Sequence, residues 1–136
     1  VSSFHRSEHS GVFVLSNCPP NIEWPKTRLG AIRFSEVLSL SDTSGSKEEL
    51  KNSLFDFLAD STPVTPSTEA RGDDALSSTL QRVIFVRGRH YGTRASSVII
   101  VDQHGQAAFY ERTFNAHSQL ALESEERIQI NELRSP

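Results

Sequence analysis

The chain has 136 residues, enough for one domain with a core, but only 36% of them are hydrophobic, so we expect part of it to be loop or tail. A formal net charge of −3 argues against a general nucleic-acid binder, which needs a dominant basic surface. No apolar run approaches the roughly 20 residues of a membrane span. The single cysteine, Cys18, excludes an internal disulfide and favours a reducing, cytoplasmic location.

The first ten residues predict a loose polar lead-in. The sequence has no methionine and no signal segment, so we expect residues 1–10 to join an upstream half that lies outside this sequence. His5 and His9 have the i, i+4 spacing of a zinc-binding helix, but no helical pattern and no third ligand accompany them. We therefore expect solvated histidines and no metal site.

A short apolar strand is predicted at residues 12–15. It ends before Pro19 and Pro20, because proline cannot continue a strand ladder. Asn17 and Cys18 stand where this strand ends. The Asn17 amide could face a ligand or a developing oxyanion, or it could simply cap the turn. The residues alone favour the cap.

The first of two predicted helices follows Trp24. Pro25 suits the favoured first helical position, and the pattern breaks at residues 41–45. The spacing predicts one apolar stripe made of Leu29, Ile32, Leu40 and either Glu36 or Val37.

The second predicted helix is better marked. Ser46 and Glu49 have capping-box spacing, and an apolar stripe recurs at i, i+4, i+7 and i+8, formed by Leu50, Leu54, Phe57 and Leu58. The two helices suggest an antiparallel pair lying on a sheet. We interpret the stripe as core and not as a ligand groove.

The middle of the chain predicts a flexible surface loop at residues 60–78, which is rich in Ser, Thr, Pro and Asp and has no periodicity. Residues 82–86 then read as a strand. The only concentrated basic region surrounds this strand and comprises Arg82, Arg87, Arg89 and Arg94. Such a cluster could hold a carboxylate or phosphate, or it could be an ordinary solvated face.

Residues 90–112 predict a polar turn followed by a β-hairpin. The β-branched run at 98–101 is typical of a strand covered on both faces, residues 102–105 supply turn chemistry, and residues 106–112 return as the second strand. Residues 116–126 fit either a short helix or a loop, and the alternation at 127–131 predicts a last strand. The fold class is therefore α+β, with about five strands, antiparallel pairing and two packed helices, over residues 11–133.

Four motifs, in this order and spacing, resemble the C-terminal half of the Transport and Golgi organization protein 2 family, also called the NRDE-motif family. The resemblance covers residues 11–114. The motifs are Val14-Leu15-Ser16-Asn17, Trp24-Pro25-Lys26, Tyr91-Gly92-Thr93-Arg94 and Phe109-Tyr110-Glu111-Arg112.

The resemblance implies a four-layer αββα sandwich like that of the N-terminal nucleophile hydrolases, of which this chain supplies about half. The family's Met-Cys start and its Asn-Arg-Asp-Glu motif belong to the other half, and Val1 carries no nucleophile. This chain alone is therefore not expected to perform nucleophilic catalysis. We expect one sheet face to be covered by the missing N-terminal half or by a second copy.

The resemblance also assigns residues to a site. In an amidohydrolase, Asn17 would help to bind the oxyanion and Arg94 would polarise the nucleophile region. Tyr91, Gly92 and Thr93 form at least a turn that orients Arg94. For Glu111 and Arg112, the structural expectation is a cross-strand ion pair of little energetic value at the surface.

Two functional hypotheses remain open. The family is linked to intracellular haem trafficking, to lipid and acyl-chain metabolism and to secretory-pathway organisation, and its members are described in cytosol and mitochondria and carry Golgi in their name. The first hypothesis is a carrier module for a small amphipathic ligand such as haem or an acyl group, bound by Tyr91, Thr93, Arg94, Arg89 and Cys18. Cys18-Pro19 is the dipeptide of regulatory haem-binding motifs, and equally a plain strand-end thiol. The second hypothesis is the C-terminal portion of an amidohydrolase whose nucleophile lies on the missing half.

Overall fold

The structure is a computed structural model that describes residues 11–16, 22–41, 45–64 and 80–130. Its elements are α1 (Pro25–Ser41), α2 (Lys47–Leu58), β1 (Ala95–Val101), β2 (Gln106–Phe114) and β3 (Leu120–Gln129). The predicted lead-in at 1–10, most of the predicted loop at 60–78 and the predicted site residues Asn17 and Cys18 lie outside the described residues. No helix within the described ranges is long and apolar enough to cross a membrane.

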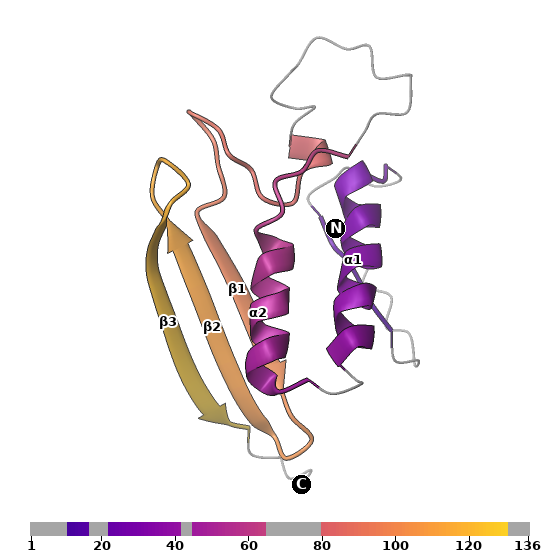
Figure 1. Ribbon diagram of the computed structural model, residues 1–136, viewed down its shortest axis with the longest axis vertical. Coiled ribbons are helices and arrows are strands. Elements are labelled where there is room, and N and C mark those ends of the chain that lie inside the picture. Colours follow the sequence, from indigo (N-terminus) through magenta and orange to yellow (C-terminus); the bar gives the residue numbers. More distant parts are fainter. Residues whose placement is uncertain (1–10, 17–21, 42–44, 65–79, 131–136) are drawn as a thin grey trace, which may run out of the picture.

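The fold is α+β, as the sequence predicts. The three strands form one antiparallel sheet in the order β1-β2-β3, and α2 packs on β1 while α1 packs beside α2 (Figure 1). The hairpin register pairs Val98 with Tyr110 and Ile99 with Phe109. Because side chains alternate along a strand, Val98 and Tyr110 face α2, whereas Ile99 and Phe109 face away from the helices.

The N-terminus of α2 confirms the predicted capping box. The Ser46 hydroxyl accepts a hydrogen bond from the Glu49 amide at 3.2 Å, and the Glu49 carboxylate accepts one from the Ser46 amide at 2.9 Å. These two bonds satisfy amides that the first helical turn would otherwise leave without acceptors. The helix therefore begins at Lys47, as the motif indicates.

The core lies between α2 and the sheet. Its buried members are Leu54 and Phe55 of α2, Val98 of β1 and Tyr110 of β2. Lys51 is also buried on this face of α2, with its Nζ 2.5 Å from Glu48 Oε1 and 5.2 Å from the Tyr110 ring centroid. The hydrogen bond to Glu48 raises the pKa of the Lys51 ammonium, so the buried charge is retained.

The predicted stripe of α1 is wrong in two of its members. Ile32 and Leu40 are exposed by 51% and 75%, while Phe34 and Val37 pack against the core and Gly30 is the buried residue of the helix. Apolar side chains occur on nearly every side of this helix, so sequence spacing did not determine which side turns toward α2.

Two of the predicted strands are absent from the described part of the chain. Residues 11–16 are not paired as a strand, Arg82 ends a short helical turn, and residues 83–86 form an irregular loop. The second segment is nevertheless part of the interior, because Val83, Phe85 and Val86 are buried. Its backbone makes isolated hydrogen bonds and no strand ladder; the Phe85 amide, for example, donates to the Asp60 carbonyl at 2.9 Å.

The predictions for the last strands also need correction. Ile99 and Val101 are exposed by 65% and 54%, so residues 98–101 are covered on one face only, because the described helices lie on the other. The chain from Leu120 onward is neither helix nor loop but β3, which ends at Gln129. Pairing with β2 makes these polar residues a strand despite their weak β propensity.

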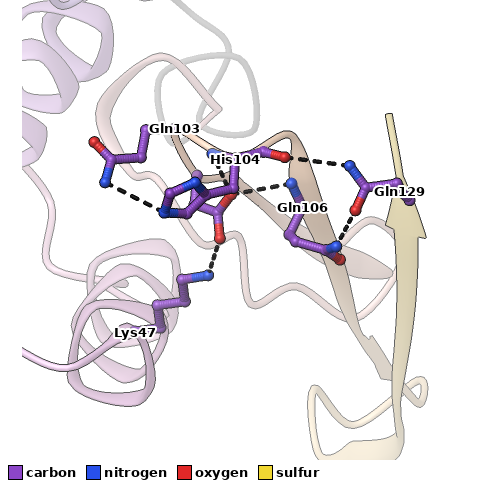
Figure 2. A network of polar contacts seen from close by, with 6 residues as sticks. Lys47, Gln103, His104, Gln106 and Gln129 are labelled. Carbon is purple, nitrogen blue, oxygen red and sulfur yellow. Dashed lines mark hydrogen bonds and ion pairs between the residues drawn. The ribbon is translucent and has the colours of Figure 1, made fainter. Parts of the chain in front are cut away.

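The turn between β1 and β2 is held by Asp102. One carboxylate oxygen accepts hydrogen bonds from the amides of His104 at 2.9 Å and Gln106 at 3.0 Å, and the other lies 2.5 Å from Lys47 Nζ at the start of α2. Figure 2 shows how Lys47, His104 and Gln106 converge there, with Gln129 bonded to the turn from β3. The turn thereby fastens α2 to one end of the sheet.

Candidate functional site

The Tyr91–Arg94 segment forms a pinned turn that leads into β1. The Thr93 hydroxyl accepts a hydrogen bond from the Val86 amide at 2.9 Å, and the Thr93 amide donates to the Val86 carbonyl at 3.0 Å. On its other side, the Arg94 carbonyl accepts from the Phe114 amide at 2.8 Å. Arg94 therefore leaves a backbone that is fixed both to the buried 83–86 loop and to the end of β2.

Close backbone approach explains the glycines of this turn. A Cβ at Gly88 would lie 2.4 Å from the Tyr91 carbonyl oxygen, and a Cβ at Gly92 would lie 3.2 Å from the Val86 carbonyl oxygen. The first contact is impossible without a backbone shift. Gly88 thus allows the chain to fold back on itself beside Tyr91.

A hollow of about 340 Å³, which we call the arginine hollow, opens at this turn. Residues 88–94 line one side, and Asn115, Ala116 and Ser118 of the β2–β3 turn line the other. Arg89, His90 and Arg94 are exposed there, and no acidic residue is among the lining residues. Within the described residues, neither Arg89 nor Arg94 has an ion pair, so both guanidinium groups are available to an anion.

The far wall of the arginine hollow is also fixed. The Asn115 side-chain oxygen accepts hydrogen bonds from the amides of His117 at 2.9 Å and Gln119 at 3.0 Å. Ser118 has a φ of 58°, in the left-handed region that tight turns use. The turn that faces Arg94 therefore has a definite shape.

A larger apolar groove, of about 590 Å³, lies between residues 13–16, the two helices and β1. Phe34 of α1 and Leu54, Phe57 and Leu58 of α2 contribute apolar side chains to its lining. The α2 stripe, which the sequence favours as core only, therefore also lines a groove. Ser16 lies at its end and accepts a hydrogen bond at 3.0 Å from the Thr27 hydroxyl.

A hollow of about 170 Å³, which we call the connecting hollow, lies beside both the groove and the arginine hollow. It shares Lys26 and Ile84 with the groove, and it shares Tyr91, Gly92 and Thr93 with the arginine hollow. Trp24 lines this connecting hollow, and the Lys26 ammonium lies 4.9 Å from its ring centroid. The three spaces are thus neighbours with common lining residues, and they range from apolar to cationic surroundings.

Four predicted ligand residues come together in this region: Arg89, Tyr91, Thr93 and Arg94 all line the arginine hollow. Of the other predicted arginines, Arg82 donates from Nε to the Val64 carbonyl at 2.7 Å, and Arg87 stacks on Phe85 with its Cζ 5.0 Å from the ring centroid. The predicted basic region is therefore divided. Arg82 and Arg87 contact the 83–86 loop and its neighbours, while Arg89 and Arg94 have no ion pair in the part of the chain that the structure describes.

Sequence reasoning missed several residues of the site, and it misjudged one pair. Asn115 and Ser118 had no signal beyond turn chemistry, since their role follows from a turn that is distant in sequence from Arg94. Glu111 and Arg112 do not pair with each other, because neighbours in a strand point to opposite faces. Glu111 instead accepts from the Ser97 hydroxyl at 3.1 Å, and Arg112 Nε lies 2.6 Å from Glu123 Oε2.

In chemical terms, the arrangement places an apolar cleft near two guanidinium groups that have no ion pair among the described residues, on an α+β scaffold, and this chemistry suits a small amphipathic anion. Residues 2–116 match the Transport and Golgi organisation 2 family model. The chain therefore belongs to that family, which confirms the resemblance of the four motifs.

Two relatives with curated names are similar to this chain. The mouse Transport and Golgi organization 2 homolog is 30% identical over 107 residues, and the human Transport and Golgi organization protein 2 homolog is 31% identical over 107 residues. Each match covers 76% of this chain and 38% of the relative. The chain therefore spans well under half the length of these relatives.

Proposed function

We propose that the chain is a ligand-binding module that holds a small amphipathic carboxylate for transport. The apolar part of the ligand occupies the groove, and its carboxylate reaches Arg89 and Arg94. The common lining residues of the three hollows support this assignment, because a single elongated molecule that extends across them would meet apolar side chains along one part and guanidinium donors at its end. Tyr91 and Thr93 border the passage between the two surroundings.

Haem and long-chain acyl groups share the chemistry that the site requires, namely an apolar body with carboxylate at one end. The arginine hollow suits haem propionates and a fatty-acid carboxylate equally. Cys18, the proposed axial ligand of haem, lies outside the described residues. Since the relatives are named for transport and Golgi organization, the proposal places the carrier in the cytoplasm and at the Golgi.

Trp24 provides a direct test, because it is the only tryptophan and it lines the connecting hollow. Titration with oleate should change Trp24 fluorescence in a saturable way, and methyl oleate should bind more weakly because it lacks the carboxylate. Haem is tested by a shift of its Soret band, with and without Cys18→Ala. Saturable binding of oleate, of haem or of both supports the proposal and identifies the source, while unsaturable responses to both would refute it.

Two variants assign the contacts. Arg94→Ala should weaken oleate binding about ten- to hundredfold, since a hydrogen bond to a charged group is worth about 1.5–3 kcal/mol. Phe13→Glu should also weaken oleate binding, because Phe13 lines the groove and the new carboxylate would oppose burial of the acyl chain there. Phe13 is 61% exposed, so the substitution should not disturb the core. The matched control is Arg28→Ala, an exposed arginine of α1 that lines none of these hollows.

The second candidate function is the C-terminal portion of an N-terminal-nucleophile amidohydrolase. It is favoured by the Arg94 guanidinium, which lines the arginine hollow and has no ion pair among the described residues, and which would act together with Asn17 on a nucleophile from another part of a family-length protein. The test is amide hydrolysis after co-expression of this chain with the rest of a family-length relative. Turnover that falls with Arg94→Ala supports this candidate, and a complex without turnover removes it.

A further inference from the structure

The apolar groove has a definite end along α1. Three of the α1 residues that line it, Lys26, Gly30 and Phe34, follow one another at intervals of four, so they lie in a row on one side of the helix. Lys26 also lines the connecting hollow, whereas Phe34 is the last residue of α1 in the lining. Val37, about one turn further along, packs against the core instead. Along α1, the groove therefore extends from the connecting hollow to Phe34.

Two aromatic rings lie at this end. Phe34 of α1 and Phe57 of α2 are stacked, with ring centroids 6.2 Å apart and an angle of 17° between the ring planes, and both line the groove. The two helices run in opposite directions (Figure 1), so Leu54 and Leu58 of α2 line the same part of the groove as the first half of α1. We call the two rings the aromatic wall. Because aromatic side chains have few rotatable bonds, this wall is a stiff boundary.

Gly30 gives the groove its width midway along this row. It is the buried residue of α1, and it has no side chain that could occupy the groove. Among the described residues, a Cβ at this position would meet only Val14 Cγ1, at an ordinary contact distance of 3.6 Å. Position 30 therefore has room for a Cβ, and a larger side chain there would fill the groove between Lys26 and Phe34.

We infer, on the basis of the proposed function, that the groove limits the length of the ligand's acyl chain: the aromatic wall stops the chain, and Gly30 leaves it room to reach that wall. Phe34 follows Lys26 by eight residues, so it lies about 12 Å further along the helix axis. An extended hydrocarbon chain advances about 1.25 Å per carbon, because its bonds are about 1.5 Å long. The groove therefore holds about ten carbons.

The arginine hollow turns this limit into a limit on the whole ligand. Arg94 holds the carboxylate, so the chain enters the groove from the connecting hollow and its methyl end points to the aromatic wall. The connecting hollow is smaller than the groove, about 170 Å³ against about 590 Å³, so it accommodates fewer carbons than the groove does. The ligand is therefore a straight-chain carboxylate of more than about ten and fewer than about twenty carbons.

The experiment is a titration of the chain with straight-chain fatty acids from octanoate to eicosanoate, followed by Trp24 fluorescence. The affinity should rise about fourfold with each added carbon and stop rising at a length between decanoate and eicosanoate. An affinity that still rises at eicosanoate, or that does not depend on chain length, would overturn the inference and leave the proposed function in place. Absence of binding by every member would refute the proposed function and the inference together.

Two variants should move the limit in opposite directions. Gly30→Leu fills the groove about 6 Å before the aromatic wall, so the affinity should stop rising about five carbons earlier. Phe57→Ala removes one ring of the wall, so the affinity should continue to rise beyond the wild-type limit. Phe57 is not among the side chains packed against the core cluster, so this variant decides the question if Gly30→Leu does not fold.

The matched control is Ser35→Leu, which adds a leucine at an exposed position of α1 that does not line the groove. The chain length at which its affinity stops rising should agree with that of wild type within one carbon. The position of the limit is the readout, and a general loss of stability or affinity does not shift it. A limit that is the same in wild type and Phe57→Ala would overturn the inference, as would a Gly30→Leu chain that folds and keeps the wild-type limit.

Discussion

The guanidinium carbon of Arg112 on β2 lies 4.1 Å from the ring centroid of Phe55 on α2. Phe55 is among the most buried residues of the chain, at 2% exposed, and Arg112 Nε donates to Glu123 of β3 at 2.6 Å. The cation thus links the buried face of the helix to two strands. It acts beside Lys51, which approaches Tyr110 from the helix side at 5.2 Å.

Arg112→Ala should therefore destabilise the fold by about 1–2 kcal/mol, since it removes a partly desolvated cation–π contact and its stem packing. The free energy of unfolding of Arg112→Lys should lie between those of wild type and Arg112→Ala, because an ammonium does not stack as a planar guanidinium does. Urea unfolding measures both. Arg127→Ala is the control: its pair with Glu125 is also 2.6 Å long, but the Arg127 side chain is 76% exposed, so this substitution should destabilise the fold much less than Arg112→Ala. Equal losses at both arginines would contradict the role of Phe55.

The Asp102 turn predicts an acid-dependent contribution to stability. The hydrogen bond from Lys47, followed by that from the Gln106 amide, lowers the pKa of the Asp102 carboxyl from 3.8 to about 2. A group whose folded-state pKa is depressed stabilises the fold above its unfolded pKa and loses that contribution as the pH falls. The stabilisation should therefore be complete above about pH 5 and disappear between about pH 4 and pH 2.

Thermal melts between pH 6 and pH 2 test this contribution. The Tm of Asp102→Asn should fall less across that window than the Tm of wild type. Asp56 is an exposed acid of α2, so the Tm of Asp56→Asn should fall as much as that of wild type. Asp60 also has a lowered pKa, chiefly through the Thr62 amide, so the variant should retain some acid sensitivity. Parallel curves for wild type and Asp102→Asn would exclude the Lys47–Asp102 link as a source of stability.

Two glycine substitutions should have opposite effects. Gly88→Ala places a Cβ 2.4 Å from the Tyr91 carbonyl oxygen, so it should cost about 1–3 kcal/mol and loosen the turn before Arg94. Gly30→Ala places a Cβ 3.6 Å from Val14 Cγ1, an ordinary contact, within α1. It should be neutral or stabilising by up to about 1 kcal/mol, because glycine is a poor helix former. Urea midpoints that shift in the same direction for both variants would contradict these geometries.

The Thr93 hydroxyl should matter more than its methyl group. Thr93→Val keeps the shape but leaves the amide of Val86, a residue that is 6% exposed, without its side-chain acceptor, at a cost of about 1–3 kcal/mol. Thr93→Ser keeps the hydroxyl and should lose much less. Chemical denaturation compares the two. If serine and valine behaved alike, the hydrogen bond to Val86 would not be what fixes the turn.

Local features of this fold could be predicted from the sequence, and features set by distant packing could not. The capping box at Ser46, Pro25 at the start of α1 and the hairpin around Asp102 each depend on neighbours within a few residues. The apolar runs at 12–15 and 82–86 have strand composition, but a strand also requires a paired neighbour, which sequence spacing does not reveal. Phe55 and Lys51 face the sheet because packing sets the rotation of α2.

The candidate site likewise has one part that the sequence predicts and another part that depends on distant packing. Arg89, Tyr91, Thr93 and Arg94 were predicted because they occur in one segment, and they do line one hollow. Its other wall, at Asn115 and Ser118, is brought there by the full length of the β1–β2 hairpin. The groove arises between elements that are distant in sequence, so the α2 stripe gave no indication that it lines a cleft.

The central claim is that one ligand extends from the apolar groove to Arg94. Amide and methyl chemical-shift changes on titration with oleate test it most directly, because they report every contacted residue at once. The account predicts contiguous changes at Leu54 and Ile84, through Trp24, to Gly92 and Asn115. Changes confined to Phe109, Leu122 and Ile128 would contradict it, because the ligand would then bind the sheet face that is turned away from the helices and not the three hollows.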